Sequence, residues 1–213
     1  MKKVFFILLP LVFLFSSCVE IVEEITVNAD QSGTASLHMD LGTFGSLATS
    51  LGGKYFQGNM LDQLKKLPET AAGILKNING LTNVVPITDK KGLYSVSFNF
   101  KNAKQLNAAL YKLLGIKKPF FAPNYMRLNK RKLVKKNYAP DLRLFIKKYK
   151  DQLKDAEFLK LITYKTIFHF PREVTHFSNK KSTLSTDKKT LEFKCTLDEL
   201  LTSGTNIGNK VRY

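Results

Sequence analysis

Alternating apolar and polar residues constrain the fold of this chain more than any other feature. Three long stretches have this pattern, at residues 19–27, 94–100 and 162–170. Successive side chains of a β-strand point to opposite faces, so a period of two residues is typical of a strand with one buried face. The sequence therefore predicts half-buried strands in the first, middle and last thirds of the chain.

Turn-forming residues join several alternating runs in pairs. The runs 19–27 and 35–41 are separated by an Asp-Gln-Ser-Gly sequence, and the runs 84–88 and 93–100 by Asp-Lys-Lys-Gly. Asp, Ser and Gly favour tight turns, because Asp and Ser side chains bond locally to the backbone and Gly tolerates positive φ. We therefore expect each pair to form a β-hairpin.

Helical signals lie between these hairpins and after them. Pro68 is expected to divide a weakly patterned helical region at 42–80 into two pieces. Asn102 is a suitable cap for a helix that Gly115 would end, and Pro140 suits the first turn of another. Strands, then helices, then strands predict an α+β fold with a largely antiparallel sheet built from hairpins and several packed helices. The expected elements nearer the C-terminus are strands at 191–195 and 207–213 and a short helix at 196–201.

The N-terminus is expected to be a sorting signal rather than part of this fold. Lys2 and Lys3 precede an apolar run from Val4 to Phe15, which Ser16, Ser17 and Cys18 follow. A membrane span needs about 20 apolar residues, and an ordinary secretory signal ends in an A-x-A-like site. The segment instead resembles a bacterial lipoprotein signal with its lipobox, from which it departs only in having Phe15 in place of Leu.

This resemblance implies a lipid anchor on Cys18. The signal peptide at 1–17 would be removed, and diacylglyceryl and an amide-linked acyl chain such as palmitate would hold residue 18 at a membrane. We expect the mature chain, 18–213, to form a single α+β domain. A strand beginning at Val19 would leave little tether between lipid and fold. Val19 in place of Asp favours the outer membrane, facing the periplasm.

Positive charge is concentrated in the middle of the chain. Residues 101–154 contain 16 Lys and Arg against 2 acidic residues, and the core of this basic segment is 117–154. One interpretation is a solvated helix face; the other is a surface for anionic lipid, glycolipid or an envelope protein. Nucleic acid is not expected at an exported address. The predicted surface residues are Arg127, Lys130, Arg131, Lys132, Lys135, Lys136, Arg143, Lys147, Lys148 and Lys150.

Catalytic patterns are weak in this sequence. His169 and His176 have no carboxylate or cysteine at metal-ligand spacing, so we predict no metal and no cofactor. Glu23 and Glu24 are adjacent on a predicted strand and would point to opposite faces, which makes them a poor acid–base pair. Cys195 alternates with charged neighbours and is expected to be a buried structural thiol.

Several short motifs of the mature chain resemble uncharacterised bacterial envelope lipoproteins. They are the Cys-Val-Glu-Ile start at residue 18, the turn with Asp30 and Gly33, the strand entering the Asn102 cap, and the late turn containing Asp187. The resemblance implies no activity. The sequence therefore favours a membrane-anchored envelope lipoprotein acting as a non-enzymatic binding or structural module. The alternative is a hydrolase-like envelope enzyme whose site assembles only in the fold.

Overall fold

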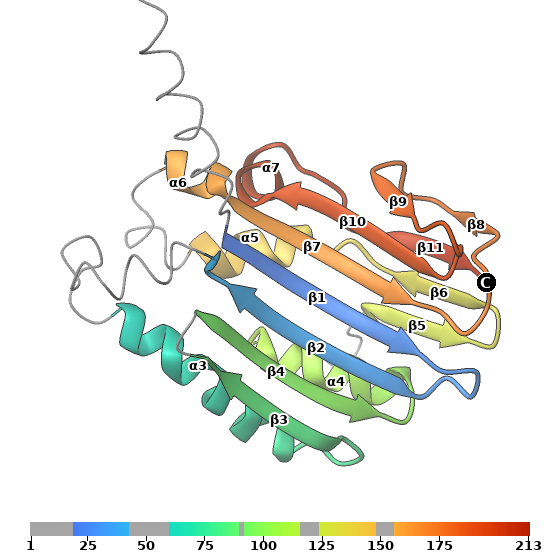
Figure 1. Cartoon of the computed structure of the whole chain (residues 1–213), viewed down its shortest axis with the longest axis horizontal. Helices are drawn as coiled ribbons and strands as arrows, with labels where there is room; N and C mark the ends of the chain where they lie inside the picture. Colours follow the sequence, from blue (N-terminus) through green and yellow to red (C-terminus); the bar gives the residue numbers. More distant parts are fainter. Residues whose placement is uncertain (1–18, 43–59, 90–91, 116–123, 148–155) are drawn as a thin grey trace, which may run out of the picture.

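The computed structural model describes residues 19–42, 60–89, 92–115, 124–147 and 156–213 (Figure 1). Their strands form two sheets, one of seven strands and one of four. Among these residues, no helix combines the length and apolar character needed to cross a membrane. Residue 18, the predicted lipidation site, lies outside the described residues.

The large sheet contains both predicted hairpins. β1 and β2 pair antiparallel, as do β3 and β4, which confirms the two hairpins. β1 and β7 are parallel neighbours, and the other pairs are antiparallel. The strand order is β3-β4-β2-β1-β7-β10-β9. The bounds are β1 Val19–Val27, β2 Gly33–Asp40, β3 Thr82–Thr88, β4 Leu93–Phe100, β7 Ile162–His169, β9 Ser182–Leu184 and β10 Thr190–Thr196.

The small sheet is entirely antiparallel, in the order β5-β6-β11-β8. β5 and β6 form a tight hairpin inside the basic middle of the chain, where the sequence pattern did not indicate strands. β11 falls within the strand expected at 207–213. The bounds are β5 Met126–Asn129, β6 Lys132–Lys135, β8 His176–Phe177 and β11 Asn209–Arg212.

The described helices follow most of the expected signals. The Asn102 side chain accepts a hydrogen bond from the Lys104 amide at 3.0 Å, which confirms the predicted cap of α4. The predicted break at Pro68 is wrong, because α3 continues through this buried residue while packing against β3 and β4. The bounds are α3 Met60–Lys76, α4 Ala103–Leu113, α5 Ala139–Lys147, α6 Ala156–Leu161 and α7 Leu197–Thr202.

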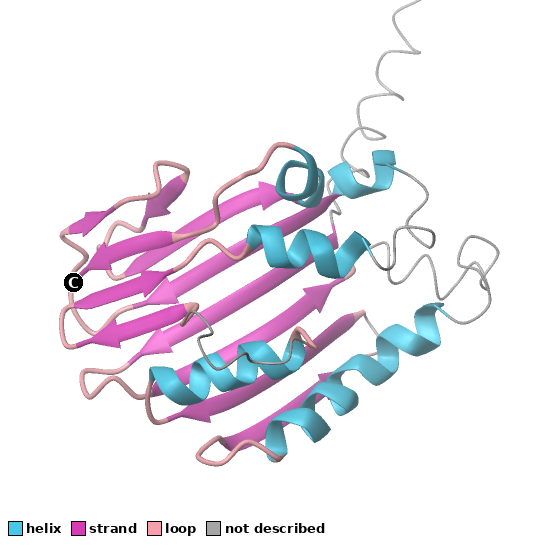
Figure 2. Ribbon diagram, turned by 180° about the vertical axis from the view of Figure 1, so that it is seen from behind, coloured by secondary structure: helices cyan, strands magenta, loops and turns pink. Residues whose placement is uncertain are grey.

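The elements are arranged in two layers. The large sheet is one layer, and α3, α4, α5 and the small sheet lie together against one of its faces (Figures 1 and 2). We call this group the second layer. No described helix or strand covers the opposite face of the large sheet, which we call the outer face. This mixture of helices and mostly antiparallel strands confirms the predicted α+β class.

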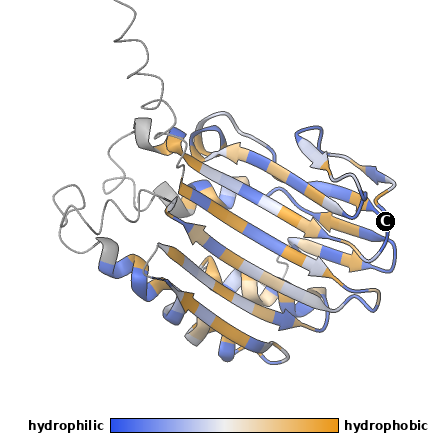
Figure 3. Ribbon diagram, in the orientation of Figure 1, coloured by the Kyte–Doolittle hydropathy of each residue, from blue (hydrophilic) through white to orange (hydrophobic). Residues whose placement is uncertain are grey.

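Apolar side chains fill the space between the layers in two clusters. One contains Ile25, Phe98 and Leu133, and the other contains Val19, Tyr111 and Leu197. Hydropathy alternates along the strands of the large sheet, as a sheet with one covered face requires (Figure 3). The first strand, β1, contributes to both clusters and therefore passes through the whole core.

Candidate functional site

One ion pair lies inside the protein, between the two sheets. Lys135 Nζ, from β6, is 2.6 Å from Glu23 Oε2, from β1. Only 2% of Lys135 and 6% of Glu23 are exposed. Charged groups are almost never buried to this degree unless they are paired, because removing them from water is costly. The two side chains therefore stabilise one another in the core.

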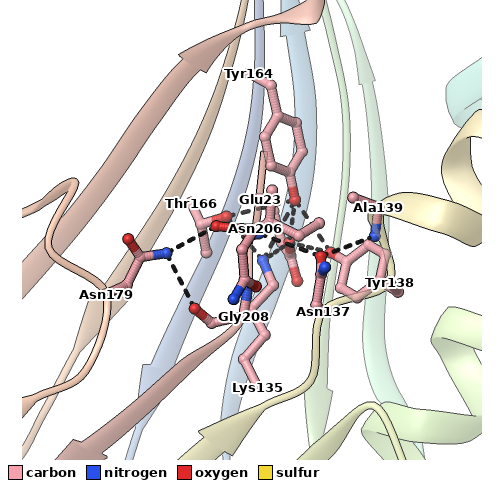
Figure 4. A network of polar contacts seen from close by, with 11 residues as sticks. Glu23, Lys135, Asn137, Tyr138, Ala139, Tyr164, Thr166, Asn179, Asn206 and Gly208 are labelled. Carbon is pink, nitrogen blue, oxygen red and sulfur yellow. Dashed lines mark hydrogen bonds and ion pairs between the residues drawn. The ribbon is translucent and has the colours of Figure 1, made fainter. Parts of the chain in front are cut away.

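Hydroxyl groups complete this buried cluster (Figure 4). Tyr138 and Tyr164 both donate hydrogen bonds to Glu23 Oε2, at 2.5 and 2.7 Å. The Lys135 ammonium also donates to Thr166 Oγ1 at 2.8 Å. The five residues come from β1, β6, β7 and the segment after β6, so the cluster links the small sheet to the centre of the large one.

Burial and charge shift the pKa values in the cluster in opposing ways. Burial alone would raise the pKa of Glu23, but the Lys135 cation and hydrogen bonds from Lys135, Tyr138 and Tyr164 together lower it. Burial lowers the pKa of Lys135, and the neighbouring Glu23 carboxylate opposes that effect. Burial also raises the pKa of Tyr138 and Tyr164 well above the ordinary value. The lowered pKa of Glu23 and the raised pKa of both tyrosines favour an ionised carboxylate beside neutral phenol groups at neutral pH.

The hydrogen bonds of the cluster connect the small sheet to the large sheet. Three of its donors converge on Glu23 Oε2, while Oε1 has no hydrogen-bond partner among the described groups. Neither Glu23 nor Lys135 is accessible to a substrate in solvent, because both side chains are buried. Within the described ranges, no group of three or more His, Cys, Asp or Glu side chains could hold a metal ion.

Lys135 was predicted to belong to a basic surface, and that prediction is wrong. It shares the inward face of β6 with Leu133, so its ammonium meets Glu23 rather than solvent. Lys136 and Arg143 are half-buried, and Arg143 Nε has no hydrogen-bond partner among the described groups. Lys147 ends α5. Lys148 and Lys150 lie outside the described residues.

The remaining predicted cations gather on the side of the small sheet that faces away from the large sheet. Met126, Leu133 and Val211 point inward, so the intervening side chains point outward. Arg127 and Lys132 are on this side, and Lys130 and Arg131 form the turn between β5 and β6. β11 adds two cations that the basic run in the sequence did not include. We call this set the cationic face: Arg127, Lys130, Arg131, Lys132, Lys210 and Arg212.

The cationic face brings like charges together without compensating them. Lys132 lies directly opposite Arg212, whose other strand neighbour is His176. Like charges directly opposite in a sheet are destabilising. β5, β6, β8, β11 and the β5–β6 turn contain no Asp or Glu. Among the described residues, no ion pair involves a member of the cationic face.

On the outer face of the large sheet, basic side chains contact carboxylates. Lys165 Nζ on β7 is 2.6 Å from a carboxylate oxygen of Glu20 on β1, and His169 Nε2 is 2.7 Å from Glu24 Oε1. Glu24 therefore points outward while Glu23 points inward, as their adjacent positions predicted. In these contacts a basic side chain is matched by a carboxylate in the neighbouring strand, whereas no described carboxylate pairs with the cationic face.

Cys195, the predicted structural thiol, and His169 both contact ordinary neighbours within the large sheet. Cys195 is buried on β10, and burial raises the pKa of its thiol to about 11, so it is not activated as a nucleophile. His169 bridges Glu24 and the Thr190 hydroxyl, at 2.7 and 3.0 Å. Both residues contact neighbours within the sheet, and neither is part of a catalytic arrangement among the described side chains.

Comparisons with known proteins found a distant structural similarity and no family. No protein-family model matches the chain, and no curated protein is similar enough to count as a match. Among solved structures, the chain is similar to the NMR structure of the folded domain of the LppM (Rv2171) protein from Mycobacterium tuberculosis. The two are 11% identical with a TM-score of 0.41, over 92% of this chain and 88% of that one. We therefore base the proposed function on the residues of this chain.

Proposed function

We propose that this protein is a lipid-anchored, non-enzymatic module of the bacterial cell envelope, and that its cationic face binds anionic lipid headgroups. One observation carries the proposal: six cations share a small surface with no described carboxylate partner. Cations assembled at such an electrostatic cost favour an anionic partner that compensates them.

The membrane address comes from the N-terminus. Cys18 follows a lipobox-like segment, and two or three acyl chains on it would anchor the protein firmly. β1 begins at Val19, the next residue, so the anchor would hold the folded part close to the bilayer. The outer membrane, with the protein facing the periplasm, is the proposed location. At that distance, weak headgroup contacts act at high local concentration.

The strength expected of such a face is substantial. Each Lys or Arg near an anionic leaflet contributes about 1 kcal/mol, and the contribution falls off within about 8 Å at physiological salt. Two cations removed together should therefore weaken binding by tenfold or more. The effect should shrink as salt is added, because exposed charges are screened.

Vesicle binding tests this proposal with a matched pair of variants. The chain from residue 18 onward, made with Cys18→Ser to prevent lipidation, is mixed with vesicles containing phosphatidylglycerol and sedimented. Lys132→Gln combined with Lys210→Gln removes two cations of the cationic face. Lys189→Gln combined with Lys194→Gln removes two exposed lysines associated with the large sheet.

We expect the first pair to lose tenfold or more in affinity, and the second to remain close to the parent. Equal losses in both pairs would show that only net charge matters, and would overturn the assignment of the face. Absence of parent binding at low salt would overturn the lipid-headgroup function itself. Both pairs replace lysines at the surface, so a folding defect should not separate them.

A further inference from the structure

We infer that the protein lies flat, with α4, the small sheet and α5 of the second layer against the bilayer and the outer face of the large sheet turned away from it. This inference rests on the proposed function and specifies its geometry. It requires that α4 carry further positive charge beside the cationic face and that α5 provide an apolar contact. It also requires that the anchor and the cations both reach the membrane.

The side chain of Asn107 connects α4 to the small sheet by hydrogen bonds. Asn107 donates a hydrogen bond to the Met126 carbonyl of β5 at 2.7 Å and accepts one from the Met126 amide at 2.9 Å. Asn107 is buried and also donates to Ala103 within the helix. These bonds fix α4 beside β5, and the helix and the small sheet lie next to each other in the second layer (Figure 2).

The exposed side of α4 extends the positive charge. Leu106 and Ala109 are buried, so Lys104 and Lys112 lie on the side of the helix directed away from the core. The helix contains no acidic residue. α3, which completes the second layer, has mixed charges, and its Asp62 pairs with Lys65 at 3.4 Å. The positive surface is therefore centred on α4 and the small sheet.

An exposed leucine favours a lipid bilayer over a purely polar anion as the partner. Leu144 on α5 is 64% exposed, and α5 lies in the same layer as α4 and the small sheet. Apolar side chains that flank cations enter the boundary between headgroups and acyl chains when such surfaces bind membranes. A free phosphate would leave Leu144 without a matching apolar contact.

The positions of the anchor and the cations fix the orientation. Val19 begins β1 at one end of the large sheet, and the β5–β6 turn lies at the other, beside the C-terminal residue, whose amide donates to the Arg131 carbonyl (Figure 1). β1 has nine residues and spans about 26 Å at the usual rise of about 3.3 Å per residue. With almost no tether after Cys18, both ends can reach one bilayer only if the long axis runs along it.

The chain contains no tryptophan, which makes a single introduced Trp a clean probe of orientation. Leu144→Trp places the probe on the second layer, and Ile87→Trp places it on β3, where the native side chain is 45% exposed. The lipidated full protein carrying either variant is reconstituted in vesicles of phosphatidylglycerol and brominated phosphatidylcholine. Quenching by bromine reports which side chain approaches the acyl region.

We expect the Leu144→Trp protein to lose about half of its indole emission and shift to the blue, as a side chain at the acyl boundary should, while the Ile87→Trp protein stays unquenched. Quenching of the Ile87→Trp protein alone, of both variants or of neither would overturn the flat orientation. Cosedimentation of the Lys132→Gln, Lys210→Gln protein decides the proposed function separately, because it does not depend on orientation. Neutral vesicles should abolish the quenching of Leu144→Trp while the lipid anchor still retains the protein.

Discussion

Lys132 and Lys135 lie three residues apart on β6 and occupy opposite electrostatic environments. Lys135 is on the inner face of the small sheet, where its ammonium is 2.6 Å from the Glu23 carboxylate. Three hydroxyl groups, of Tyr138, Tyr164 and Thr166, each lie within 3.3 Å of that ammonium or of that carboxylate. Lys132 is on the opposite face, where its cross-strand neighbour is another cation, Arg212. One face of the sheet pairs its buried cation with a carboxylate, whereas the cations of the other face have no carboxylate partner among the described residues.

The difference separates a structural use of charge from a proposed binding use. Removing one partner of a buried pair leaves the other charged in a region without water, so the inner face should govern stability. The cations of the outward side contribute little to stability and leave their charge available to a partner. A substitution on either face should therefore leave the role of the other intact.

The largest effect should come from Lys135→Met. This change leaves the Glu23 carboxylate buried without its cation, and we expect a loss of about 3–5 kcal/mol in the free energy of unfolding. Lys132→Met, on the opposite face of the same strand, should change it by less than about 0.5 kcal/mol. Urea unfolding measures both. Similar losses in the two variants would abolish the contrast between the faces.

Asn107→Ala should have the next largest effect. It removes three hydrogen bonds and leaves the backbone amide and carbonyl of Met126 without their partner, at a cost of about 2–3 kcal/mol. In hydrogen exchange, the Met126 amide should exchange faster in the variant than in the parent, while amides at the centre of the large sheet should keep their rates. Unchanged protection of that amide would show that Asn107 does not fasten α4 to β5.

Acid should weaken the inner face in a defined direction. The folded pKa of Glu23 lies below its ordinary value of 4.5, so the folded state binds fewer protons than the unfolded state between the two values. The stability contributed by Glu23 is therefore complete above about pH 4.5 and declines as the pH falls through the folded pKa, by up to about 1.4 kcal/mol per pH unit. The combined variant Glu23→Gln, Lys135→Met should lose less stability than the parent between pH 5 and 3. A profile as steep as that of the parent would assign the acid effect to other carboxylates.

A small effect on stability, and a gain rather than a loss, should come from Arg212→Thr. Removing one of two opposed cations relieves repulsion, and we expect a gain of about 0.2–1 kcal/mol in urea unfolding. The same change should weaken binding to anionic vesicles by about fivefold, since it removes about 1 kcal/mol of attraction. Loss of stability together with unchanged binding would contradict the proposed role of the cationic face.

Local signals in the sequence predicted most of the fold. The period of two in 19–27 and 93–100 indicated two hairpins that the structure confirms, and Asn102 caps α4 as expected. The β5–β6 hairpin was missed because each strand has only four residues and the segment reads as a basic run. Pro68 was misread because tertiary packing of α3 outweighs the local cost of the proline.

The buried pair was only half visible in the sequence. Glu23 falls in the apolar phase of 19–27, and this position by itself indicates an inward carboxylate. Its partner is 112 residues away, and nothing in the local pattern marks Lys135 as inward rather than outward. The cationic face had the same difficulty, since Lys210 and Arg212 join Lys132 only through the pairing of β6 with β11. Such pairings are set by the whole fold.

The central claim is that the outward side of the small sheet, and not the outer face of the large sheet, meets anionic lipid. Amide NMR of the unlipidated chain with phosphatidylglycerol bicelles that carry a paramagnetic headgroup tests this residue by residue. We predict relaxation enhancement concentrated at residues 127–132 and 209–212, with little at 34–40 and 93–99. Enhancement centred on the latter segments, or spread evenly over both, would contradict it.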